Sequence, residues 1–182
     1  MISLQKVKEL LGITGTDYDA QINFMIPIVE SDVKRILNHK FNEKVYCIYT
    51  EGSTVISNLG GFSSRGFLLD HDITEGRVIE GTGIPDDTYI TDYDEETAKA
   101  TISQATTASG TYIRTSILIG QWAPIAKMIW YKISKLNTDE DWNKVASQAM
   151  GPVSISFIDT VDAKTGYPID LIKDLGVGYL KV

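Results

Sequence analysis

The chain has 182 residues, of which 43% are hydrophobic and 23% charged, proportions that are typical of globular proteins and exclude wholesale disorder. Its formal net charge of −7 argues against tight binding to nucleic-acid phosphates, which requires a basic surface. The longest apolar stretch, residues 116–133, is interrupted by Gln121, Pro124, Lys127 and Lys132, so we expect a buried helix there rather than a membrane span.

The negative charge is concentrated in the middle of the sequence. Residues 50–115 contain four of the 17 Lys and Arg and eleven of the 24 Asp and Glu, a net charge of −7, which leaves thirteen of each in the rest of the chain. The same block is rich in Gly, Thr and Asp, whereas both flanks show helical periodicity. The pattern therefore predicts a separate acidic unit, whose charge favours solubility.

The N-terminal flank predicts two helices. Ser3 can cap the first helix, which Gly12 ends. Asp17 or Asp19 can cap the second, and Pro27 is expected to kink that helix or break it into two. The apolar residues of the second helix recur at helical spacing and predict one buried stripe: Ile22, Met25, Ile26, Val29, Val33, Ile36 and Leu37.

The middle block predicts short antiparallel strands. VYCIY (45–49) is rich in residues that favour strands, and GIPDDT (83–88) and DEET (94–97) read as turns. Further strands are predicted at GFLLD, RVIEG, TYITDYD, KATIS and TYIRT. Short strands at this regular spacing predict a small barrel or sandwich.

Helical periodicity returns near Trp122, since Pro124 is tolerated in a first turn. A short helix (about 138–149), a strand at GPVSISF (151–157) and a short helix from Pro168 to Leu175 follow. The predicted fold class is thus α+β. It comprises a small helical bundle of three to four helices with a short C-terminal strand and helix, into which an antiparallel β barrel or sandwich-like domain is inserted.

The predicted domain boundaries follow from this order of elements. Residues 1–44 and 115–182 form a discontinuous helical core, and residues 45–114 form the inserted β domain. Residues 167–182 form a C-terminal helix and an extended tail.

No catalytic, cofactor or metal site is predicted. His39 ends a predicted helix. His71 lies between Asp70 and Asp72, but adjacent residues of a strand point to opposite faces, so a metal site at His71 would need ligands from elsewhere. Cys47, the one cysteine, lies in an apolar run, which favours a buried inert thiol and a reducing compartment. An acidic cluster could hold calcium, but its spacing does not fit an EF-hand loop and favours solvated turns: Asp86, Asp87, Asp92, Asp94, Glu95 and Glu96.

The opening SLQKVKELLGITGTDYDAQINFMIPIVESDVKRILNHKF (3–41) resembles the start of the head-tail connector (adaptor, or head completion) proteins of long-tailed bacteriophages. APIAKMIWYKI, GPVSISF and YPIDLIKDL match later segments of that family in the same order. The resemblance covers about 1–44 and 115–182. The middle block departs from the family, which joins its helices by a shorter β excursion, and residues 75–111 look similar to small β modules of phage structural proteins.

The resemblance implies a structural role without catalysis or a cofactor. Such proteins form a ring, usually of twelve copies, beneath the portal of the filled capsid. They extend the DNA channel and provide a docking surface for the tail. The implied partners are other copies, the portal protein, a tail terminator, stopper or other neck protein, and packaged DNA that passes without sequence-specific binding. The implied location is the virion neck, after assembly in the host cytoplasm, with no membrane partner.

The apolar residues of the tryptophan-rich helix and of the C-terminal segment (167–182) are our candidates for packing between helices, protomers or the portal, because aromatic residues are enriched at interfaces. These candidate interface residues are Trp122, Ile129, Trp130, Ile133, Tyr167, Ile169, Leu171, Leu175, Tyr179 and Leu180.

Two alternatives remain open from the sequence. In the first, the β block is a phage-associated binding module for a host surface or a carbohydrate, anchored by a helical base. It would predict a cluster of exposed aromatic residues, for which the candidates are Phe62, Phe67, Tyr89, Tyr93 and Tyr112. The second, a small enzyme, lacks any recognisable set of catalytic residues.

Overall fold

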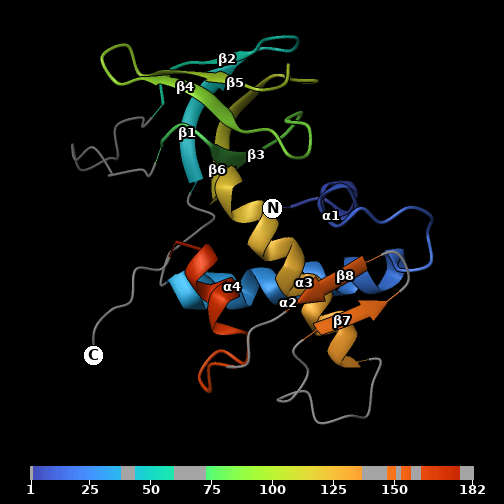
Figure 1. The fold of residues 1–182 in the computed structure, drawn as a ribbon. Coiled ribbons are helices and arrows are strands. Elements are labelled where there is room, and N and C mark those ends of the chain that lie inside the picture. Colours follow the sequence, from blue (N-terminus) through green and yellow to red (C-terminus); the bar gives the residue numbers. More distant parts are fainter. Residues whose placement is uncertain are drawn as a thin grey trace. The chain divides into compact units, whose positions relative to one another are not determined.

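The structure is a computed structural model that describes residues 2–37, 44–59, 73–136, 147–150, 153–156 and 161–176. The chain divides into two compact units. Lys40–Ile119 form one, here called the β unit, and Ile2–His39 together with Gly120–Val182 form the other, the helical unit. The described residues contain four α-helices and small antiparallel sheets (Figure 1), so the predicted α+β class is confirmed.

The first two helices are α1 (Leu4–Leu11) and α2 (Asp19–Leu37). The Ser3 hydroxyl accepts a hydrogen bond from the Lys6 backbone N–H at 3.1 Å, which confirms the predicted cap. Gly12 ends α1 at a φ of 67°, the left-handed region that favours glycine.

The helix α2 runs through Pro27 without a break, so the prediction that it could split into two was wrong. Proline inside a helix costs about 3 kcal/mol. Pro27 is exposed, however, and the buried stripe lies on another face. Each buried apolar side chain contributes about 1.5–3 kcal/mol, so this stripe outweighs the cost of the proline. Its buried apolar members are Ile22, Met25, Ile26, Val29 and Val33.

The third helix, α3 (Trp122–Leu136), starts where the sequence predicts. It follows a short 3-10 turn, η1 (Ile119–Gln121). Within the unit α3 contacts α1, α2 and α4 (Ile169–Asp174). The most buried side chains of α3 are Ile125, Ala126, Met128, Ile129, Trp130 and Ile133.

The helix predicted at about 138–149 was wrong at its C-terminal end. Residues 147–149 were expected to be helical, but Ser147–Met150 form strand β7, which pairs antiparallel with β8 (Val153–Ser156). Pairing with a neighbouring strand supplies hydrogen bonds that override a weak local helix preference. The strand predicted at 151–157 is confirmed by β8. The rest of that predicted helix (138–146) and the strand predicted at GFLLD lie outside the described residues.

The β unit contains two three-stranded antiparallel sheets. The first has the order β1 (Lys44–Tyr49), β6 (Gly110–Leu118), β3 (Arg77–Glu80). The second has the order β2 (Val55–Ile56), β5 (Lys99–Ile102), β4 (Ile90–Asp94). Single bridges connect their edges, Ile48 to Ser57 and Val78 to Tyr89, but the ladders of the described residues close no barrel.

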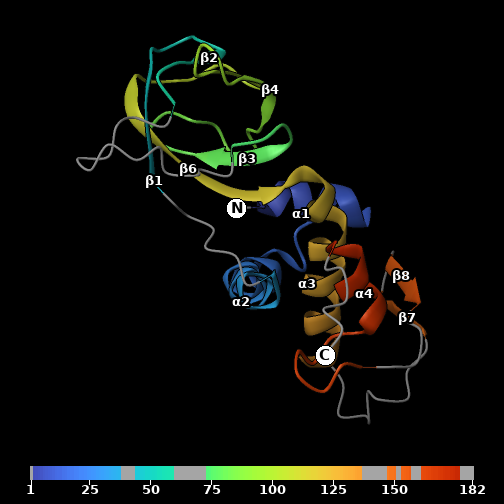
Figure 2. The ribbon, with the colours of Figure 1, turned by 90° about the vertical axis from the view of Figure 1, so that its left-hand side faces the viewer.

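The strands lie around a common interior (Figure 2). A cluster of buried apolar side chains forms the core there. Alternate residues of β1, namely Val45, Cys47 and Tyr49, point into it. Cys47 is buried, as predicted, and burial raises the pKa of its thiol to about 12, which disfavours the reactive thiolate. The other core residues come from the remaining strands and their connections: Ile56, Leu59, Ile73, Ile79, Ile90, Ala100, Ile102 and Ile113.

Replacing Gly83 by alanine should strongly destabilise the β unit. Gly83 has a φ of 69°, and a Cβ there would meet the backbone of Ala108. Backbone strain and overpacking together should lower the free energy of unfolding by about 3 kcal/mol. Gly52→Ala is the matched control, because Gly52 has a φ of 77° and open space around it. It should cost about 1 kcal/mol. Urea unfolding of both variants measures the difference, and equal losses would contradict the packing argument.

Candidate functional site

A tight turn precedes α4 in the helical unit. Val161 and Pro168 form an antiparallel bridge, and Gly166 has a φ of 72°. The Asp162 carboxylate accepts hydrogen bonds from the backbone N–H groups of Thr165, at 3.1 Å, and Lys164, at 3.4 Å. Hydrogen bonding, chiefly with Thr165, holds the pKa of Asp162 below its usual value. This turn fixes the position of the next residue, Tyr167.

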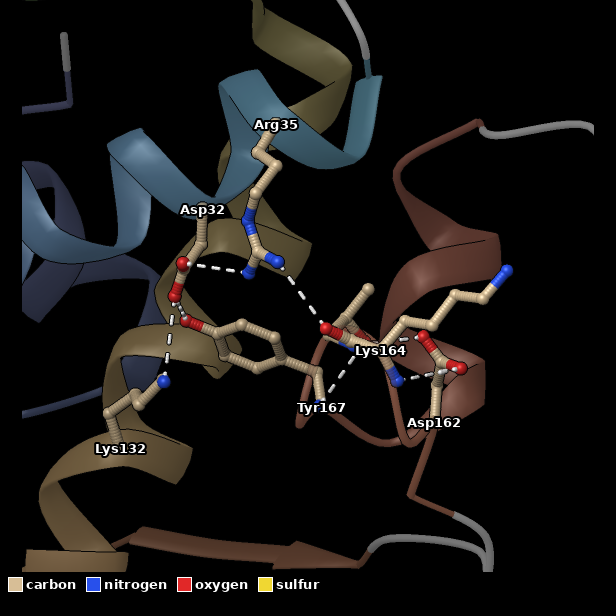
Figure 3. A network of polar contacts seen from close by, with 7 residues as sticks. Asp32, Arg35, Lys132, Asp162, Lys164 and Tyr167 are labelled. Atoms are coloured by element: carbon tan, nitrogen blue, oxygen red, sulfur yellow. Dashed lines mark hydrogen bonds and ion pairs between the residues drawn. The ribbon is translucent and has the colours of Figure 1, made fainter.

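Tyr167 joins the turn to α2 and α3 through Asp32 (Figure 3). The Tyr167 hydroxyl donates to Asp32 Oδ2 at 2.7 Å. Lys132 of α3 places its Nζ 3.5 Å from the same oxygen, and Arg35 Nη2 lies 3.2 Å from Oδ1. Arg35 also donates to the Lys164 carbonyl at 3.3 Å. One carboxylate thus links two helices and the turn.

These contacts set the pKa of Asp32. Burial by itself raises the pKa, but the hydrogen bond from Tyr167 and the charges of Lys132 and Arg35 outweigh it. The pKa therefore lies below the ordinary value of 3.8, and the carboxylate is ionised at neutral pH. Burial, followed by the bond to Asp32, raises the pKa of Tyr167, which stays a neutral donor.

The candidate interface residues differ in how deeply they are buried. Ile129, Trp130, Ile133, Tyr167, Leu171 and Leu175 are buried inside the helical unit. Trp122 and Ile169 are half-buried. Tyr179 and Leu180 lie outside the described residues. The Gln121 side chain also donates to the Leu175 carbonyl at 3.1 Å. The described part of the C-terminal segment therefore packs in its own unit, and a role between protomers stays a prediction for these ten residues.

An exposed apolar pair on α2 was missed by the sequence analysis. Phe24 is 64% exposed, and Ile28, one turn further along the same helix, is also exposed. Leu10 of α1 is a third exposed apolar residue of the helical unit. The available signal was that Phe24 and Ile28 fall outside the buried stripe of α2. We call these two residues the α2 ridge.

The other candidates from the sequence are half-buried or lie outside the described residues. Tyr89, Tyr93 and Tyr112 are half-buried, and Tyr93 packs against the β core. Phe62, Phe67, His39 and His71 lie outside the described residues. Among the residues that are described, no group of three or more His, Cys, Asp or Glu could hold a metal ion. None of the helices described is long and apolar enough to cross a membrane.

Residues 1–59 match the family model described as phage gp6-like head-tail connector protein. The match supports the head-tail connector family. The matched residues include α1, α2, β1 and β2, so the resemblance noted in the opening helices is confirmed. The match also supports a structural role for the chain in a phage. The inserted β domain remains a prediction. No curated protein matches the chain.

Replacing Tyr167 by phenylalanine should destabilise the helical unit. The change removes a buried hydrogen bond to a charged group, which contributes about 1.5–3 kcal/mol. Tyr46→Phe is the control, since Tyr46 is largely exposed and should change stability by less than about 0.5 kcal/mol. Urea unfolding, monitored by circular dichroism, compares the two. Equal values would contradict an anchoring role for the Tyr167 hydroxyl.

Stability should also depend on the ionisation of Asp32. Because its folded pKa is depressed, the group stabilises the fold above its unfolded pKa, and this contribution is lost as the pH falls through the folded pKa. The difference in unfolding free energy between wild type and Asp32→Asn should therefore be largest at neutral pH and shrink below about pH 4. Urea titrations between pH 7 and the acid limit of folding measure it, and a difference independent of pH would overturn the assignment.

Proposed function

We propose that the protein assembles as a twelve-fold ring beneath the portal of the filled phage head, in the neck of the virion. There it extends the DNA channel and presents a docking surface to a tail terminator, stopper or other neck protein. The observation that carries the proposal is the match of residues 1–59 to head-tail connectors. The protein works by binding, and its partners are its own copies, the portal and the tail.

The surface of the helical unit supports this proposal. The matched stretch contains the α2 ridge, whose exposed apolar side chains are suited to burial against a partner. Stability of the unit itself comes from the opposite stripe of α2 and from the Asp32 contacts. The ridge is therefore free to serve binding, and we assign it to the contact with the portal.

The charge of the chain also supports the proposal. The net charge of −7 lies within residues 50–115, and an acidic channel wall repels phosphates, so DNA passes without adhering. The protein would then contact packaged DNA without reading its sequence.

The direct test is reconstitution with the portal. The purified chain, mixed with the portal protein of the same phage, should add a ring of density at one end of the portal in negative-stain electron microscopy. Native mass spectrometry should count twelve copies per portal. Failure to bind the portal, or labelling of the tail tip in intact virions, would contradict the proposal and favour a binding module.

The α2 ridge should be needed for portal binding but not for folding. The double variant Phe24→Ser, Ile28→Ser should bind the portal at least about tenfold more weakly, because it removes apolar contacts at an interface. Its unfolding free energy should change by less than about 1 kcal/mol, because both side chains are exposed. Asn23→Ser, also exposed on α2, is the control and should bind normally. Pull-down with immobilised portal measures binding, and unchanged affinity of the double variant would exclude the ridge.

A further inference from the structure

Apolar side chains gather on the outer face of the first β sheet. Tyr46 and Ile48 alternate with the buried residues of β1 and are 59% and 50% exposed. Val55 of the neighbouring strand β2 is 43% exposed, and the bridge between Ile48 and Ser57 brings the two strands together. Exposed apolar residues that adjoin one another in a soluble unit indicate a binding surface.

The same face carries positive charge, although the β unit is acidic overall. Lys44 of β1 lies opposite Arg114 of β6, and Tyr46 lies opposite Tyr112. The Lys44 Nζ lies 4.1 Å from the centre of the Tyr112 ring and 5.3 Å from that of Tyr46, so both rings hold the ammonium group in place. In the described strand pairs of this sheet, the acidic residue Glu80 of β3 lies opposite Arg114. We call Lys44, Tyr46, Ile48, Val55, Tyr112 and Arg114 the β1 face.

The complementary surface is the hairpin between β4 and β5. Asp92, Asp94, Glu95 and Glu96 are all exposed, and Lys99, opposite Asp94, is the one cation of the hairpin. Asp94 is engaged in the turn, where it accepts hydrogen bonds from the backbone of Glu96 and from Thr97. The other three carboxylates are exposed, that of Asp92 on β4 and those of Glu95 and Glu96 in the turn. We call residues 92–99 the acidic hairpin.

We propose that the β1 face of one copy of this chain binds the acidic hairpin of the next copy. The two surfaces have opposite charge, which steers association and fixes its register. The aromatic and aliphatic side chains in the middle of the face supply the apolar contact. Because the two surfaces differ, the contact is head-to-tail, the type that generates rings when the rotation closes. The inference rests on the proposed ring and names the surfaces that form it.

Charge also argues against the other way of pairing two copies. If two β1 faces met each other, Lys44 and Arg114 of both copies would be brought together. Juxtaposed like charges oppose association. A second copy therefore fits this face through its hairpin and not through its own β1 face.

Charge reversal with complementation tests the contact. The face variant carries Lys44→Glu and Arg114→Glu, and the hairpin variant carries Glu95→Lys and Glu96→Lys. Each alone places like charges in every contact of a homotypic ring and should self-associate at least about tenfold more weakly than wild type. An equimolar mixture should recover wild-type association, because each reversed surface finds its complement on the other variant. Glu51→Lys with Glu75→Lys, two exposed sites outside both surfaces, is the control and should associate normally.

Sedimentation equilibrium at protein concentrations up to about 1 mM, a range that detects weak contacts, measures association without the portal. Circular dichroism and urea unfolding verify that each variant is folded. The inference is overturned if wild type stays monomeric throughout this range, if neither variant weakens association, or if the mixture fails to recover it. Binding of each variant to immobilised portal is measured separately. If one of these outcomes occurs and the chain still binds the portal, the proposed function stands and only the inference fails. If wild type does not bind the portal, the proposed function itself is rejected.

Discussion

The carboxylate of Asp32 lies where α2, α3 and the turn before α4 meet, and the order of the helical unit depends on it. A buried phenol must donate a hydrogen bond, and a partly buried carboxylate must accept several. Tyr167 and Asp32 meet both needs at once, with Lys132 and Arg35 supplying the compensating charge. Because the Tyr167 side chain is fully buried, loss of Asp32 would leave its hydroxyl without this acceptor.

The β unit follows a different principle. Its core is apolar, and most charged residues of its described part are exposed, whereas Arg77 is buried. Tyr49 brings a hydroxyl into this core, and that hydroxyl donates to the Thr82 carbonyl at 2.8 Å. Rigid strands with a charged exterior can vary their surface without disturbing their packing. The family match over residues 1–59 covers α1 and α2 of the helical unit and β1 and β2 of the β unit.

Local signals in the sequence predicted much of the fold. The Ser3 cap, the start of α3 two residues before Pro124 and the end of α4 near Gly176 each depend on neighbouring residues alone. The wrong predictions arose where tertiary packing overrides local preference. The buried stripe keeps α2 continuous through Pro27, and pairing with β8 makes residues 147–150 a strand. The contact between Asp32 and Tyr167 joins residues 135 positions apart, and no local pattern indicates it. The α2 ridge escaped notice because exposure, unlike periodicity, depends on the packed structure.

The distribution of aromatic and sulfur side chains gives each unit its own intrinsic probe. Trp122 and Trp130 lie in the helical unit, and Trp142 falls in the same part of the sequence. The chain's one thiol, that of Cys47, lies in the core of the β unit. Indole fluorescence and alkylation kinetics therefore follow different halves of the same molecule. Without any added label, they can reveal whether the halves lose structure together or one after the other.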